Sequence, residues 1–278
     1  CNDVLAHVCA IGEWPHLWTV DWFQTTAEYA TGTVSVTDGS ATVTGTGTTF
    51  TAAMVGRKIR IAGGTAYYTI KTFTSTTVLV LDQTYQGTTN TAATYSIYKD
   101  EYLLRADLDQ QKRIRQAENG YALFSLSATE LDEYHPAQTG MGLPGFDVYI
   151  GRAVKTYTTG TVSMTSGTRT LTGAGTAWTT AEGVTRGTKL KIGSLLLTVN
   201  TVDSDTQITT YEVATATIAA LTTYTAILDN PVVQLAESIP DEVLTYYYRF
   251  QRIPAPMDAD NDVPDLPYPM HPLILLGM

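Results

Sequence analysis

Residues 32–50 read GTVSVTDGSATVTGTGTTF and residues 160–178 read GTVSMTSGTRTLTGAGTAW, which match at a constant offset of 128. In both copies a run of alternating apolar and hydroxyl residues reaches a turn, Asp38-Gly39 or Ser166-Gly167, and a second alternating run follows. Alternation with a period of two predicts short strands, and a glycine in the turn between them predicts a hairpin. The chain therefore carries one β-rich unit twice.

The similarity continues more loosely beyond this stretch. Residues 56–61 (GRKIRI) correspond to residues 187–192 (GTKLKI), and residues 94–97 correspond to residues 223–227. Each copy spans about seventy residues with about six strand candidates, which predicts a small antiparallel β-sandwich or barrel. Phe50 and Trp178 share one repeat position, where a large aromatic side chain can anchor each core. The basic residues Arg57, Lys58 and Arg60 alternate with apolar ones, which favours a solvated strand face over a binding patch.

A different pattern precedes the first copy. Apolar residues lie at helical spacing near the N-terminus: Val4, Leu5, Val8 and Ile11. Gly12 is a stop signal and Pro15 can open a second helix, so two short helices are expected here. Trp14, Trp18 and Trp22 recur every four residues and would share one helical face. Such a stripe forms either an aromatic binding platform or, as we expect, a core or subunit interface.

The segments between and after the two copies also show ordered patterns. Ser127, followed by Glu130, forms a capping-box motif that predicts a short helix ending before Pro136. Residues 147–150 and 232–235 read as strands. A second long strand is predicted where aromatic and apolar residues alternate: Leu244, Tyr246, Tyr248 and Phe250. This alternation leaves Tyr247 and Arg249 on the opposite, outer face, where they are interface candidates together with the three tryptophans.

These patterns predict a mainly β fold with α-helix, of the α+β class. A small core of helices and a β-hairpin is expected from residues 1–30, 100–158 and 229–278. Two related antiparallel β-sandwich or barrel domains would interrupt this core, the first at 31–99 and the second at 159–228.

The composition limits the kinds of partner. The formal net charge is -10 and only 16% of residues are charged, without a run of Lys or Arg. Binding nucleic acid by neutralising phosphates is therefore not expected as the main activity. An acidic ring would still let DNA slide through its lumen without specific binding.

The two cysteines and the apolar runs bear on location. Cys1 and Cys9 would lie roughly 12 Å apart on a helix, too far for a disulfide, so free thiols and assembly in a reducing cytoplasm are expected. The longest apolar run, residues 273–276, is too short for a membrane span, and no signal peptide is visible, so no membrane partner is expected. We expect both ends of the sequence to be cropped.

The sequence offers little for chemistry. Phosphate-loop, dinucleotide-binding, zinc-protease and nucleophile-elbow motifs are absent, and the four histidines are scattered without acidic neighbours. Asp132 and Glu133 are expected to be surface carboxylates of the predicted helix. We expect no enzyme, no catalytic residue and no cofactor. Alternating carboxylates offer one weak candidate site for a Ca²⁺ ion: Asp258, Asp260, Asp262 and Asp265. An ordinary acidic loop explains them equally, and no metal is expected.

Residues outside the repeats resemble a known family by their order and spacing. They are Tyr102-Leu103-Leu104 followed by Asp107, Leu131-Asp132 with Pro136, Gly142-Leu143-Pro144, the strand at 148–150, Tyr247-Tyr248-Arg249 with Pro254, and residues 262–267. The chain is similar in these blocks to the head-to-tail adaptors of tailed bacteriophages, also called connectors or tail tubular protein A-like proteins. Arg105 departs from the proline of the family's pattern, and the two Ig-like insertions are not general to it.

This resemblance implies a structural role in a virion. Copies would form a neck ring, twelve in number, that binds the portal protein on one side and the adjacent neck or tail protein on the other. Genome DNA would pass through the lumen, and the protein would be located in the virion after assembly in the host cytoplasm.

Two other functions are open at this point. Tandem β domains with exposed aromatic residues also occur in carbohydrate-binding or adhesive surface proteins. A tail-associated glycan hydrolase would need two carboxylates about 5–10 Å apart in a cleft. The sequence offers only isolated carboxylates, such as Glu130 and Asp132, for the second.

Overall fold

Strands dominate the protein. The computed structural model describes Leu5 and residues 14–61, 64, 66–134 and 140–257. Among these described residues, strands account for 53% and helices for 6%, with one α-helix. The expected α+β class with a small helical core is therefore wrong, because the segments outside the repeats build a β-sandwich as well.

The tryptophan segment explains much of this error. A 3₁₀ turn, η1 (Pro15–Leu17), leads directly into a strand, β1 (Trp18–Gln24). A spacing of four residues is twice the strand period as well as close to one helical turn, so Trp18 and Trp22 share a strand face. Aromatic and β-branched residues favour the extended conformation here. The helix expected before Gly12 lies outside the described residues, apart from Leu5, which is buried.

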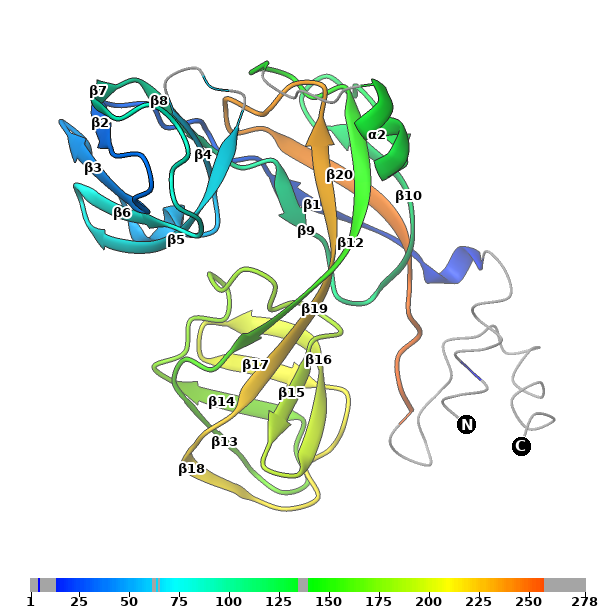
Figure 1. The fold of residues 1–278 in the computed structure, drawn as a ribbon. Helices are drawn as coiled ribbons and strands as arrows, with labels where there is room; N and C mark the ends of the chain where they lie inside the picture. The colour runs from blue at the N-terminus through cyan, green and yellow to red at the C-terminus, as the bar shows by residue number, and fades with distance from the viewer. Residues whose placement is uncertain (1–4, 6–13, 62–63, 65, 135–139, 258–278) are drawn as a thin grey trace.

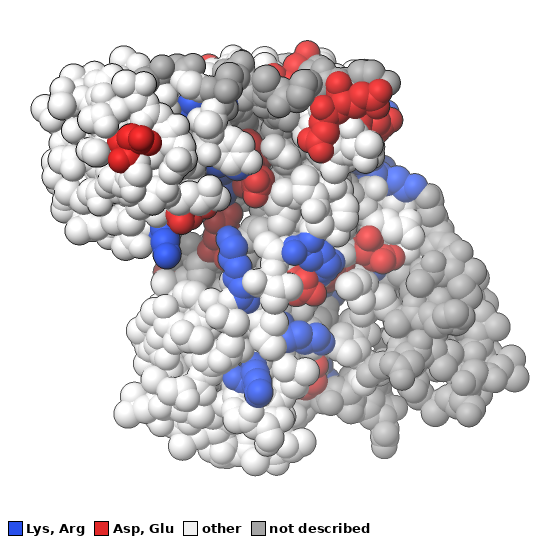
Figure 2. Space-filling view, in the orientation of Figure 1, with Lys and Arg blue, Asp and Glu red and all other residues white. Residues whose placement is uncertain are grey.

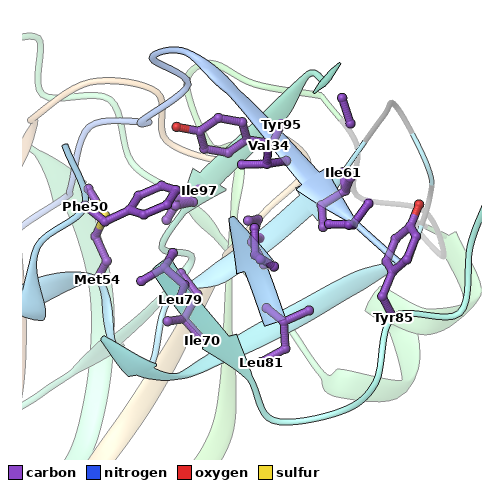
Figure 3. Close-up of a cluster of buried hydrophobic side chains, with 14 residues drawn as sticks. Val34, Phe50, Met54, Ile61, Ile70, Leu79, Leu81, Tyr85, Tyr95 and Ile97 are labelled. Atoms are coloured by element: carbon purple, nitrogen blue, oxygen red, sulfur yellow. The ribbon is translucent and has the colours of Figure 1, made fainter. Parts of the chain in front are cut away.

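The first repeat forms module 1, a curled seven-stranded antiparallel sheet with the order β7-β2-β3-β6-β5-β4-β8. Its elements are β2 (Thr33–Val36), β3 (Thr42–Thr46), η2 (Ala52–Met54), β4 (Lys58–Ile61), β5 (Tyr67–Ser75), β6 (Val78–Leu81), β7 (Asn90–Ala93) and β8 (Tyr95–Tyr98). The inward positions of every strand meet in one core, in which Phe50 lies among Ile97, Leu79 and Met54 (Figure 3). The alternation of the sequence therefore places apolar side chains inside and threonines outside.

The second repeat forms module 2 with corresponding strands. Its own elements are β13 (Thr161–Met164), β14 (Thr170–Ala174), β15 (Lys189–Ile192), β16 (Leu195–Ser204), β17 (Gln207–Thr210) and β18 (Ile218–Thr222). β13 pairs with β14 as β2 pairs with β3, and Trp178 lies fully buried where module 1 has Phe50. Gly32 and Gly160 both adopt φ near +80° where a Cβ atom would meet backbone atoms at less than 3 Å, so both copies require glycine there.

The remaining strands form a central body of two facing sheets. One sheet has the order β1-β20-β10, from β10 (Leu108–Gln116) and β20 (Thr245–Arg252). The other contains β9 (Glu101–Leu103), β11 (Phe124–Leu126) and the body halves of β12 (Phe146–Tyr157) and β19 (Thr225–Ala236). Tyr246, Tyr248 and Phe250 from the first sheet pack with Val233 and Leu235 from the second. The predicted alternation in β20 is confirmed.

The α-helix lies on the outer side of the second sheet. α2 (Ala128–Tyr134) lies beside β12 (Figure 1). It buries Leu131 against Val148 and Ala236, which form a cluster separate from the sandwich core. The central body is thus layered in the order β1-β20-β10 sheet, aromatic core, β12-β19 sheet and α2.

One long ribbon joins the central body to module 2. β12 and β19 pair from Phe146↔Ala236 to Tyr157↔Ala226 and run from the body into the module (Figure 1). The register shifts at Gly151, whose φ of +126° favours glycine, so a bulge lies between the two halves.

Candidate functional site

The outer surface of the β1-β20-β10 sheet is exposed, and we call it the open face. Side chains alternate in a strand, so the positions next to the buried aromatic ones point outward. The open face consists of Trp18, Val20 and Trp22 on β1, Tyr247 and Arg249 on β20, and Lys112, Arg113 and Arg115 on β10. Its aromatic and apolar strand, β1, and its basic strand, β10, lie at opposite edges of the sheet, with β20 between them.

Pairing across the three strands sets the arrangement of these side chains. Tyr247 lies between Trp22 and Arg115, and Arg249 lies between Val20 and Arg113. The exposed fractions are 55% for Trp22, 51% for Val20 and 44% for Tyr247. Large apolar side chains are therefore presented to solvent next to three guanidinium groups, rather than scattered singly.

A bulge in β10 adds a fourth cation to this surface. The register shifts between Gln111 and Arg113, so Lys112 is the extra residue. Its Nζ lies 5.2 Å from the centre of the Trp18 ring, a cation–π distance. A shallow hollow of about 350 Å³ extends over the basic side, lined by Val20, Lys112, Arg113, Arg115, Tyr247, Tyr248 and Arg249.

The open face carries an excess of positive charge. Arg113 and Arg249 are direct cross-strand partners, and like charges in such a pair repel. Within the described part of the chain, neither of them nor Arg115 forms an ion pair. Four of the 17 Lys and Arg residues thus gather on one surface of an acidic protein.

The layer beneath the open face is rigid. Phe23 stacks on Tyr246 at 5.6 Å and on Tyr102 at 5.1 Å between ring centres. Burial raises the pKa of Tyr246 to about 12 and that of Tyr248 further, so both phenols stay neutral under ordinary conditions. A packed aromatic core therefore fixes the strands from which the outward side chains project.

The structure brings together most of the interface residues predicted from the sequence. Trp18, Trp22, Tyr247 and Arg249 lie on the open face. Trp14 precedes η1 and is outside the strand rows, although its backbone N–H donates to Gln251 Oε1 at 3.2 Å. Sequence reasoning missed Lys112, Arg113 and Arg115, whose signal was the alternation of Arg113 and Arg115 around the apolar Ile114.

The basic residues of module 1 serve structural contacts instead. Lys58 Nζ lies 2.9 Å from Asp100 Oδ2 and 2.7 Å from Glu101 Oε1. The Arg60 guanidinium lies over the Tyr98 ring at 5.3 Å, and Arg57 Nε donates to the Ala53 carbonyl at 3.1 Å. The Lys58 ion pairs tie module 1 to the segment that enters the central body, and the other two contacts lie within module 1.

Buried carboxylates have partners as well. Burial raises the pKa of Asp147, while Ser125 Oγ at 3.1 Å and Gln111 Nε2 at 2.9 Å donate to its carboxylate. Burial also raises the pKa of Asp107, opposed by hydrogen bonds and charge from Arg105. Each is accounted for by packing of the central body.

Metal and membrane features are limited in the described ranges. No cluster of three or more His, Cys, Asp or Glu residues able to hold a metal ion occurs among the described residues. The weak Ca²⁺ candidates Asp258, Asp260, Asp262 and Asp265 lie outside them. No helix in the described part has the length and hydropathy needed to cross a membrane.

No family model matches the chain, and no curated protein matches it. The function must therefore be argued from the open face and the arrangement of the modules.

Proposed function

We propose that the chain is a non-enzymatic structural subunit of a tailed-bacteriophage particle, a head-to-tail adaptor in the neck. Copies form a ring, twelve in number, between the portal protein and the adjacent neck or tail protein, and genome DNA passes through the lumen. The subunit is assembled in the host cytoplasm and resides in the virion.

The open face is the observation that carries this proposal. Tryptophan, tyrosine and arginine are the residues that most often dominate the energy of protein–protein contacts, and the open face displays all three on a rigid sheet. Such a surface suits a subunit that is permanently in contact with other proteins. The sequence blocks that resemble head-to-tail adaptors are the second support, and the net charge of -10 suits a lumen that DNA crosses without sticking.

Labelling of particles tests the proposal. Gold-labelled antibodies against the purified chain should mark the neck of phage particles in electron micrographs. Particles assembled without the chain should have heads that do not join tails. A chain that is absent from particles, or one that labels the tail fibres, would contradict the adaptor assignment.

A carbohydrate-binding surface protein is the second candidate, favoured by the exposed rings of Trp22 and Tyr247. Aromatic faces of this kind stack on sugar rings. Saturable binding of the full chain on a glycan array, lost on Trp22→Ala and retained on Val154→Ala, would support this candidate. Val154 is a matched control because it is exposed on β12, away from the open face.

A further inference from the structure

Two surfaces of opposite charge lie on opposite sides of the central body. The open face lies outside the β1-β20-β10 sheet, and α2 lies outside the β12-β19 sheet. We propose that the open face of one copy docks on the acidic surface of α2 in a second copy of this chain, head to tail. This inference deepens the proposed function, on whose ring it rests, by naming the two surfaces that meet between neighbouring subunits.

The open face requires an anionic partner of some kind. Arg113 and Arg249 face each other across neighbouring strands, with Arg115 two residues further along β10. An apposed carboxylate relieves this repulsion and accepts hydrogen bonds from the guanidinium groups. Burying Trp22 and Val20 in the same contact removes apolar surface from water.

α2 supplies the complementary charge. Glu130, Asp132 and Glu133 are exposed on this short helix, and Figure 2 shows acidic side chains gathered over it at the upper right. Leu131 anchors the helix on the β12-β19 sheet, so the carboxylates are held by a packed element. Within the described residues Asp132 and Glu133 form no ion pair.

The positions of the two surfaces determine the kind of assembly. Two different patches on opposite sides of a subunit produce a heterologous contact, which repeats from copy to copy and closes into a ring when the rotation permits. The layers between the patches are a packed sandwich, so the relation between them is fixed. A self-complementary pair would instead need both patches on one side.

The local surfaces, and not the overall charge, favour a second copy over nucleic acid. The net charge of -10 opposes the approach of a polyanion and of a second copy alike, so the contact surfaces themselves decide between them. A second copy presents its acidic helix locally and supplies apolar contacts as well.

Charge reversal tests the pairing directly. The face variant is Arg113→Glu/Arg249→Glu, and the helix variant is Asp132→Lys/Glu133→Lys, which leaves the capping residue Glu130 in place. Mass photometry and sedimentation of the full chain should show assembly of the wild type that weakens as salt is raised. Each variant alone should raise the apparent dissociation constant by about 100-fold, because like charges then meet.

A mixture of the two variants tests whether the open face and α2 contact each other. In an equimolar mixture every contact again joins opposite charges, so assembly should return to within about tenfold of the wild type. The matched control for the face variant is Lys71→Glu/Lys191→Glu, which makes the same change in net charge as that variant at exposed residues of the two modules. This control should assemble as the wild type does.

Several outcomes would overturn the inference. They are a wild type that stays monomeric at all concentrations, variants that assemble normally, and a mixture that fails to restore assembly. Binding of a dT20 oligonucleotide to a monomeric wild type, lost in the face variant, would assign the open face to nucleic acid instead. Neck labelling by a face variant that still forms rings would leave the adaptor function standing without this interface. If the mixed variants restore assembly but the chain never enters particles, the interface would be supported and the adaptor function contradicted.

Discussion

At the scale of single residues, the two modules differ in one buried hydrogen bond. Trp178 Nε1–H donates to Tyr224 OH at 2.8 Å, and Tyr224 OH donates to the Thr159 carbonyl at 2.9 Å. In module 1 the corresponding pair is Phe50 and Tyr95, and Tyr95 OH donates to the Thr31 carbonyl. Phe50 has no ring N–H, so module 1 lacks the first of these bonds.

This difference predicts unequal effects of the same substitution. Tyr224→Phe should lower the free energy of unfolding by about 1–3 kcal/mol, because it leaves the buried Trp178 N–H without an acceptor. Tyr95→Phe should cost only about 0.5–1.5 kcal/mol, since one hydrogen bond is lost and no donor is left unpaired in the ring. Urea unfolding of both variants measures the difference, and equal losses would contradict this account.

The sequence predicted the burial and direction of several individual side chains. The shared position of Phe50 and Trp178 could be predicted because alternation and turn glycines align the two copies. The outward direction of Tyr247 and Arg249 followed from the buried residues that flank them. Their proximity to Arg113 and Arg115 could not be predicted, because 128 residues separate the end of β10 from the start of β20 and nothing local specifies that pairing.

At the scale of elements, α2 begins with a reciprocal cap. Ser127 N–H donates to Glu130 Oε2 at 2.8 Å, and Glu130 N–H donates to Ser127 Oγ at 3.2 Å, which confirms the predicted capping box. The hydrogen bonds from the backbone and hydroxyl of Ser127 hold the pKa of the Glu130 carboxyl below its usual value.

This cap predicts a pH dependence confined to the helix. A carboxyl with a lowered folded pKa stabilises the folded helix above its unfolded pKa, and that contribution is lost as the pH falls through the folded pKa. In Ser127→Ala the pKa of Glu130 should rise part of the way toward that of an ordinary glutamate, because the hydroxyl hydrogen bond is lost while the backbone N–H of residue 127 still donates to the carboxylate. A carboxyl-detected NMR titration of Glu130 in the wild type and in Ser127→Ala checks this. An unchanged Glu130 titration in Ser127→Ala would show that the hydroxyl does not contribute to the shift.

Local sequence patterns predicted some of the strands and not others. The strands of the repeats were predictable from alternation of period two. The tryptophan segment was not, because spacing by four residues fits either a helix or a strand and only pairing with β20 decides between them. β10 reads LDQQKRIRQ, in which Leu108 and Ile114 are the only apolar residues, so its strand follows from its neighbours rather than from its own sequence.

At the scale of the whole molecule, separate ionic clusters attach each module to the central body. Asp107 Oδ2 lies 2.6 Å from Arg105 Nη2 in the body and 3.5 Å from Arg186 Nε in module 2. Lys58 of module 1 pairs with Asp100, whose carboxylate also accepts from Gln234 on β19. These clusters are long-range, and the sequence alone did not indicate them.

The two attachments should therefore loosen independently. Asp107→Ala should destabilise the junction with module 2 by about 3–5 kcal/mol, because Arg105 and Arg186 lose a buried counter-charge. Lys58→Met should act in the same way on the junction with module 1, where it leaves Asp100 without its cation. Hydrogen exchange should accelerate around residues 183–188 in the first variant and in β4 and β8 in the second. Faster exchange at both junctions in either variant would mean that the modules are coupled.

The manner in which each module is attached also has an evolutionary consequence. The chain enters and leaves module 1 at adjacent positions, because Tyr29 and Ile97 exchange backbone hydrogen bonds of 2.9 Å. A gene segment that encodes residues 31–97 can therefore be acquired or deleted in one recombination event without displacing the flanking strands. Module 2 is different, since β12 and β19 continue unbroken from it into the body and any crossover there would cut paired strands. Of two copies with one fold, only the first is attached in a way that would allow its exchange without cutting paired strands.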